Sequence, residues 1–137
     1  MTTSLRLLLT AGLVSATTLL AHAKIERVVE KTFPVSGNGV LRVETHGGGI
    51  RVTPAADGQI RVTATQRIKA STDAEADELL KKLELSFLPS GNDLQVVAKY
   101  AKKPLGFQWG SWPPVAVDIA VAVPAGYATQ LTTSGGG

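Results

Sequence analysis

The chain has 137 residues, with 14 basic and 11 acidic side chains and no cysteine. This is the size of one domain, and the missing cysteines exclude disulfide bonds, thiolate catalysis and cysteine-based metal sites. Charges of both signs are interspersed instead of forming the concentrated basic patch of a nucleic-acid binder, so we expect no nucleic-acid partner.

The first 23 residues have the three parts of a secretory signal peptide. Arg6 ends a short polar head, and an uncharged stretch of apolar and small residues follows it from Leu7. Ala21 and Ala23 then supply small residues at the two positions that signal peptidase reads. We expect cleavage before Lys24, which leaves 114 residues with a net charge of about +2.

An uncleaved anchor helix is the alternative interpretation of this segment. A helix that spans a bilayer needs roughly 20 apolar residues. The apolar stretch is shorter, is diluted by threonines and ends in a cleavage site. We therefore favour an exported protein, periplasmic, on the cell surface or secreted, whose mature domain does not span the membrane.

Alternation of apolar and polar residues predicts a mainly β fold, because side chains point to opposite faces along a strand. Turn-forming residues separate the alternating segments, so we expect an antiparallel meander. The expected strands cover residues 25–35, 41–45, 50–53, 60–65, 85–88, 94–100, 115–123 and 128–133. In 115–123, valines and an isoleucine share one face and small residues line the other, which predicts close cover by a further layer.

One segment breaks the period of two. Thr72 and Glu75 have the spacing of a capping box at a helix start. Leucines then recur at helical spacing as far as Leu83, followed by Phe87, and the pattern predicts one amphipathic helix over about residues 73–84. We interpret its leucines as core residues and its early acidic residues as partners of the helix dipole.

The same pattern, a strand that ends in three glycines, occurs twice. Residues 41–46 lead into Gly47-Gly48-Gly49 and residues 131–134 lead into 135–137. Stacked strands joined by such corners would suit a β-solenoid-like stack. The first glycine run leads directly into another strand, and a last strand that ended in a flexible turn would leave an open sheet edge. We therefore expect residues 24–137 to be the N-terminal part of a longer β-solenoid.

The segments "VETHGGGIRV" and "VDIAVAVPAGYATQLTTSGGG", together with the signal peptide and the helix between them, resemble the bacterial "putative adhesin" family DUF4097 and the related autotransporter-adhesin head domain. The resemblance covers about residues 35–137. It implies an exported, all-β protein without an assigned enzymatic role and supplies no catalytic residues.

Catalytic and metal-binding motifs have weak support in this sequence. His46 and the glycines after it match the oxyanion-hole string of lipases, but no Gly-x-Ser-x-Gly nucleophile motif accompanies them. The glycine runs lack the Lys-Ser/Thr of a phosphate loop, and one histidine in the mature chain does not supply a transition-metal shell. Asp118 is interpreted as an outward-facing solubilising residue, with a buried functional acid as the alternative. We expect no enzyme activity, cofactor or metal.

A long loop is the segment most suggestive of binding. Four of the seven aromatic side chains fall in or beside residues 100–114, together with two lysines: Tyr100, Lys102, Lys103, Phe107, Trp109 and Trp112. If exposed, these residues could stack on sugars or sit at a lipid interface. The alternative, which we favour, is that the tryptophans cap one end of the core.

Three functions follow from these patterns. The first is an adhesin-like binding protein of the cell envelope or surface, with a cell-surface glycan or envelope protein as its partner. The second is a structural or envelope-stress component that docks onto another envelope protein, which an exposed sheet edge or apolar patch would favour. The third, an enzyme on a β-solenoid, would need carboxylates clustered along one face.

Overall fold

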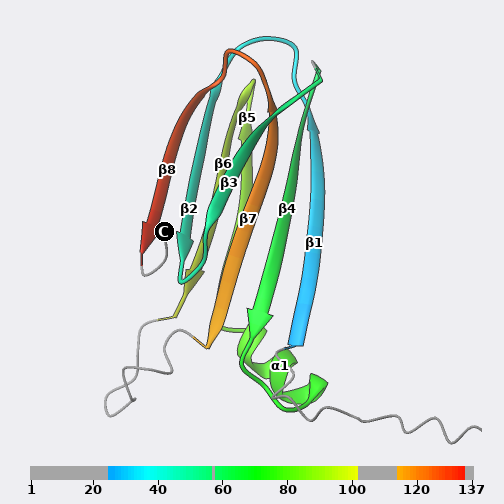
Figure 1. Cartoon of the computed structure of the whole chain (residues 1–137), viewed down its shortest axis with the longest axis vertical. Coiled ribbons are helices and arrows are strands. Elements are labelled where there is room, and N and C mark those ends of the chain that lie inside the picture. Colours follow the sequence, from blue (N-terminus) through cyan, green and yellow to red (C-terminus); the bar gives the residue numbers. More distant parts are fainter. Residues whose placement is uncertain (1–24, 57, 102–113, 135–137) are drawn as a thin grey trace, which may run out of the picture.

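A computed structural model describes residues 25–56, 58–101 and 114–134 (Figure 1). Within these ranges the chain forms strands and one helix, so the predicted mainly β fold is confirmed. The elements are β1 (Ile25–Pro34), β2 (Val40–His46), β3 (Ile50–Ala55), β4 (Gln59–Ile68), α1 (Asp73–Leu80), β5 (Leu83–Ser90), β6 (Asp93–Tyr100), β7 (Val115–Pro124) and β8 (Ala128–Ser134).

The strands form two four-stranded sheets that face each other (Figure 1). The first sheet has the order β1-β4-β7-β3, and the second has the order β5-β6-β2-β8. Both sheets are mixed: β7 pairs with β3 in parallel, and β2 pairs in parallel with both β6 and β8. The other pairs, β1–β4, β4–β7 and β5–β6, are antiparallel.

The connectivity differs from the expected meander. Among the described strands, β5 and β6 are the one consecutive pair that also lies side by side in a sheet. The turns at 36–39, 47–49 and 125–127 each carry the chain from one sheet to the other. A period of two specifies which face of a strand is buried, but it does not specify the neighbouring strand.

The core lies between the sheets and takes the apolar face of each inner strand. Its fully buried side chains are Leu41, Val43, Ile60, Val62, Ile68, Leu94, Val96, Val115, Val117, Ile119 and Val121. Thr45 is the polar exception among them: its hydroxyl donates to the Val117 carbonyl at 2.7 Å, which ties β2 to β7 across the core. A buried hydroxyl needs such a partner, because leaving it unpaired costs about 1–3 kcal/mol.

The helix begins where the capping box predicts. The Thr72 hydroxyl accepts from the Glu75 amide at 3.2 Å, and the Glu75 carboxylate accepts from the Ser71 amide at 3.1 Å. The predicted end at residue 84 is wrong, because α1 ends at Leu80 and β5 begins at Leu83. Residues four apart share a face in a helix and also in a strand, so Leu83 and Phe87 fit both patterns.

Two acidic side chains of α1 also anchor the helix to the sheet. Arg27 of β1 makes an ion pair and hydrogen bond with Asp77 and lies 3.7 Å from the Asp73 carboxylate. The hydrogen bond to Asp77 is the main reason that the pKa of Arg27 rises above its ordinary value. Of the helix residues only Ala76 is fully buried, and Leu79 and Leu80 pack on the edge of the core.

The repeat-related strands lie side by side. β2 and β8 pair in parallel with Val43 opposite Leu131 and His46 opposite Ser134. This register aligns the two segments as the repeat in the sequence aligns them, since each strand ends one residue before its glycine run. The two copies of the repeat therefore lie in neighbouring strands, although they are about 90 residues apart in the chain.

The alanine face of β7 is not covered by a further layer of the described chain, contrary to our expectation. Ala120 is exposed, while Ala116 and Ala122 are half-buried. Their register on β4 gives the physical reason for their size, because Ala116 stands opposite Arg67 and Ala122 opposite Arg61. Small side chains on β7 leave room for the long arginines beside them.

Candidate binding site at the loop end

Four connections meet at one end of the two sheets: residues 35–39, the β3–β4 turn with Gly58, residues 91–92 and residues 125–127. We call this the loop end. The opposite end carries α1 and the glycine corner 47–49 between β2 and β3 (Figure 1). Loops held by a rigid sheet are where binding residues usually lie.

Hydrogen bonds from the β5–β6 turn hold the first loop in place. The Ser36 amide donates to the Asn92 side-chain oxygen at 3.0 Å, and the Val40 amide donates to the Asp93 carboxylate at 2.8 Å. The Tyr127 hydroxyl donates to the Asn92 carbonyl at 2.9 Å. Asn92 thus joins the loops before β2, before β6 and before β8.

Backbone contacts complete the frame. The Val35 amide donates to the Gly58 carbonyl at 3.0 Å, and the Ala128 amide donates to the Gly39 carbonyl at 3.1 Å. Gly39 has no room for a side chain, because a Cβ there would lie 2.4 Å from the Asn92 carbonyl oxygen. Gly126 has φ 94°, a conformation that L side chains rarely adopt. The loop end is therefore held by bonds that link all four connections.

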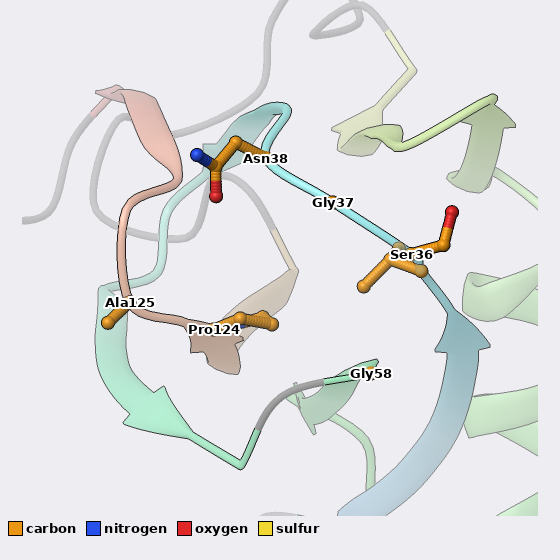
Figure 2. A pocket seen from close by; sticks show the side chains of 7 residues that line it. Ser36, Gly37, Asn38, Gly58, Pro124 and Ala125 are labelled. Atoms are coloured by element: carbon orange, nitrogen blue, oxygen red, sulfur yellow. The ribbon is translucent and has the colours of Figure 1, made fainter.

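A pocket of about 570 Å³ opens between these loops (Figure 2). Figure 2 shows Ser36 and Ala125 on opposite sides of it, with Pro124 between them. Its described lining is Val35, Ser36, Gly37, Asn38, Gly58, Pro124 and Ala125. None of these side chains carries a charge, and the volume is within the range of about 300–1,000 Å³ that small-molecule sites occupy.

The pocket offers two side-chain polar groups, the Ser36 hydroxyl and the Asn38 amide, and both residues are exposed. Pro124 also lines the pocket, but it is buried and exposes little surface. A hydroxyl and an amide donate and accept hydrogen bonds without a formal charge. The composition therefore suits a neutral polar ligand better than an ion.

Tyr127 supports the loop end through its hydrogen bond to Asn92. Desolvation by burial, followed by the negative charge of Asp93, raises the pKa of Tyr127 above its ordinary value. At neutral pH any tyrosine hydroxyl is protonated, so this one donates to the Asn92 carbonyl, and the raised pKa extends this range further into alkali. From the sequence, Tyr127 and Asn92 are recognised only as turn residues, because nothing in a single sequence reveals that two turns 35 residues apart touch.

The glycine corner at the opposite end is a structural joint. A Cβ on Gly48 would lie 1.9 Å from the Val117 carbonyl oxygen, so the corner rests directly on the β7 backbone. The Ile119 amide donates to the Gly49 carbonyl at 2.9 Å. The Nε2 atom of His46 lies 3.9 Å from the Glu44 carboxylate. Gly48, in the glycine run after His46, packs on the β7 backbone. This packing explains the lipase-like string without an oxyanion hole.

Asp118 is on the outer face of β7, as predicted, but it is not merely solubilising. Its carboxylate accepts from the Gly49 amide at 2.9 Å and lies 2.7 Å from Nε of Arg67 on β4. The side chains of Asp118 and Arg67 are 43% and 35% exposed. Asp118 therefore links the glycine corner to two strands of the first sheet. The sequence shows the lone acid but not the corner that it reaches.

Of the six residues predicted to contact a ligand, Tyr100 is the one that lies within the described ranges. Tyr100 is 8% exposed at the end of β6, and burial raises its pKa, so this side chain belongs to the core. The prediction that Tyr100 belongs to an exposed ligand-contact loop is wrong, because the alternation of β6 turns its side chain inward. Lys102, Lys103, Phe107, Trp109 and Trp112 lie outside the described residues.

No group of three or more histidine, aspartate or glutamate side chains that could hold a metal is found within 25–56, 58–101 and 114–134. In the same ranges, no helix has both the length and the apolar character needed to cross a membrane.

No protein-family model and no curated protein matches the chain. Among solved structures, the chain is similar to a "putative cell adhesion protein" from Clostridium sporogenes, with 9% identity, a TM-score of 0.41, and coverage of 78% of this chain and 47% of that one. It is also similar to a "putative adhesin" from Bacteroides fragilis, with 14% identity, a TM-score of 0.37, and coverage of 78% and 41%.

This chain spans less than half the length of either structure. Both TM-scores are too low to support an argument about function, and the resemblance to DUF4097 stays a prediction.

Proposed function

We propose that the chain is an exported, non-enzymatic, adhesin-like protein that binds a neutral glycan at the loop end. The N-terminal segment supports export, because it has a charged head, an apolar middle and small residues before Lys24. The observation that carries the binding role is the uncharged pocket, framed by hydrogen bonds from four connections.

The chemistry of the pocket favours sugar hydroxyls. The Ser36 hydroxyl and the Asn38 amide can each donate to and accept from a hydroxyl group. A pocket of about 570 Å³ has room for one or two sugar rings.

The experiment combines export and binding on one purified protein. Mass spectrometry of the exported chain should show an N-terminus at Lys24. On a glycan panel, this protein should bind neutral glycans. The double variant Ser36→Ala/Asn38→Ala should bind them at least about tenfold more weakly, which corresponds to a loss of about 1.4 kcal/mol of binding free energy. Ser86→Ala, on the outer face of β5, is the matched control and should leave binding unchanged.

Two results would contradict the proposal. If the protein stays in the cytoplasm with its first 23 residues attached, the proposal that it is exported is wrong. Glycan binding that is absent, or equal in the wild type and the Ser36/Asn38 variant, would remove the loop end as the site.

A further inference from the structure

Asn38 and Gly39, beside the pocket, form a sequence pair that usually makes a tight hairpin turn with positive φ at both residues. Here the pair has another setting, because residues 35–39 carry the chain from β1 of one sheet to β2 of the other. Neither residue has a positive φ. Gly39 is required by its close approach to the Asn92 carbonyl, but the turn does not require an asparagine at position 38.

The side-chain amide of Asn38 is unrestrained. Asn38 is exposed, and its side chain makes no hydrogen bond within the described residues. It lies against the β7–β8 connection, where a Cβ on Gly126 would be 3.2 Å from its oxygen. Figure 2 shows it among the residues that line the pocket. The Gly39 carbonyl accepts from the Ala128 amide at 3.1 Å, whereas the Gly39 amide donates to no group of the described chain.

The exposure of Asn38 does not come from a sheet edge. The pair precedes β2, an inner strand that has β6 on one side and β8 on the other. The turn before β6 approaches the pair through Asn92, and the connection before β8 approaches it through Gly126. Described neighbours therefore lie on both sides, and Asn38 is exposed at the end of the two sheets, where the pocket opens.

An asparagine that precedes a glycine is prone to an intramolecular reaction, because no side chain shields the glycine nitrogen. The Gly39 nitrogen gives up its proton and forms a bond to Cγ of Asn38. The Cγ–Nδ2 bond breaks, and the amide group leaves with that proton as ammonia. Water then opens the resulting succinimide at one of its two carbonyls, which gives aspartate or isoaspartate without any change of oxidation state.

We propose that Asn38 is a deamidation site and acts as a timer on the loop-end pocket. Both reacting groups, the side-chain amide and the Gly39 nitrogen, are unbonded, so no hydrogen bond has to break first. The reaction replaces a neutral amide by a carboxylate, and the described pocket lining, which has no charge, gains one. The site also loses two N–H donors, because a carboxylate only accepts.

Isoaspartate has a second effect, because it adds a carbon atom to the main chain. The loop that would lengthen is held on both sides, by Asn92 and by the bond from Ala128 to Gly39. We therefore expect a neutral ligand to bind more weakly as the protein ages. This consequence rests on the proposed function, whereas the reaction at Asn38 does not.

Asn92, the other asparagine of the chain, is the internal control. Its side-chain oxygen accepts from the Ser36 amide at 3.0 Å, and its carbonyl accepts from the Tyr127 hydroxyl at 2.9 Å. The next residue is Asp93, whose side chain shields its nitrogen and whose carboxylate accepts from the Val40 amide at 2.8 Å. We therefore expect Asn92 to react much more slowly than Asn38.

Peptide mass spectrometry tests the reaction on purified residues 24–137 kept in mildly alkaline solution. Trypsin places the two asparagines on different peptides, 32–42 and 83–99. The first peptide should gain the mass difference between an amide and an acid at least about tenfold faster than the second. It should also split into aspartate and isoaspartate forms. Equal rates in the two peptides, or no gain at Asn38, would overturn the proposal.

Glycan binding before and after the same incubation tests the timer. Aged wild type should bind a neutral glycan at least about threefold more weakly than fresh protein, the effect of losing one hydrogen bond. Asn38→Gln forms the cyclic product far more slowly, so its fresh and aged samples should bind equally. Asn38→Asp should bind weakly without ageing.

Two outcomes separate this inference from the proposed function. If Asn38 deamidates but aged and fresh wild type bind equally, the timer is wrong and the pocket remains a glycan site. If fresh wild type binds no neutral glycan, the proposed function and the timer are both wrong, and the peptide masses still decide whether Asn38 is a modification site.

Discussion

At the scale of single residues, adjacent glycines in this chain have different roles. Gly48 is buried against the β7 backbone, whereas the nearest atom to a Cβ on Gly49 would be an Asp118 oxygen at 3.8 Å. The sequence shows three identical letters in a row. It could predict the corner, but it could not predict which glycine is indispensable, because that depends on a strand about 70 residues away.

Gly48→Ala should therefore destabilise the fold by about 2 kcal/mol or more, since its Cβ would overlap the Val117 carbonyl and force the backbone apart. Gly49→Ala is the matched control and should change the free energy of unfolding by less than about 1 kcal/mol. Urea unfolding of both variants measures the difference. Equal losses would show that the corner does not rest on β7 as described.

The two tyrosines predict weaker folding in alkaline solution. Burial raises the pKa of Tyr100, and burial with the Asp93 charge raises that of Tyr127. The folded state thus holds these protons more tightly than the unfolded chain. This stability is complete below the ordinary tyrosine pKa of about 10 and is lost as the pH rises through the raised values.

Unfolding in urea across about pH 8 to 11 should show the free energy of unfolding falling above about pH 10. Tyr127→Phe should cost about 0.5–1.5 kcal/mol at neutral pH by removing the bond to Asn92, and it should flatten part of this fall. A free energy that stays level or rises in alkali would contradict the assignment.

At the scale of elements, the sequence predicts faces better than neighbours. The alternation of β4 and β7 correctly identifies their buried sides, and the capping box correctly places the start of α1. The predicted end of α1 is wrong because Leu83 and Phe87 fit the period of a helix and also that of a strand. Which strands pair is decided by contacts across the core, and a period of two carries no information about them.

The link between Asp118 and the glycine corner is testable at this scale. Asp118→Ala removes an ion pair with Arg67 and the bond to the Gly49 amide, so we expect a loss of about 1–2 kcal/mol after allowance for its partial exposure. Glu30→Ala removes a more open pair with Arg61, 3.6 Å apart, and should change stability by about 0.5 kcal/mol or less. If thermal unfolding shows equally small losses for Asp118→Ala and Glu30→Ala, Asp118 does not stabilise the glycine corner.

At the scale of the whole molecule, the two ends have different roles. The helix end is closed by α1 and by the glycine corner, whereas the loop end holds the uncharged pocket. The two copies of the repeat pair in parallel as β2 and β8, but neither this pairing nor the pocket was predicted from the sequence. Its lining comes from three connections that are remote in the chain, and Ser36 or Pro124 alone has no distinctive pattern.

The most direct test of the account maps the ligand on isotope-labelled residues 24–137 by NMR titration with the neutral glycan that binds best on the panel. We predict that the amide shifts change at Gly37, Gly58 and Ala125, which line the pocket, and that those of Gly47–Gly49 at the opposite end do not. Shifts that change only at the glycine corner or along β8, with none at the loop end, would contradict the account.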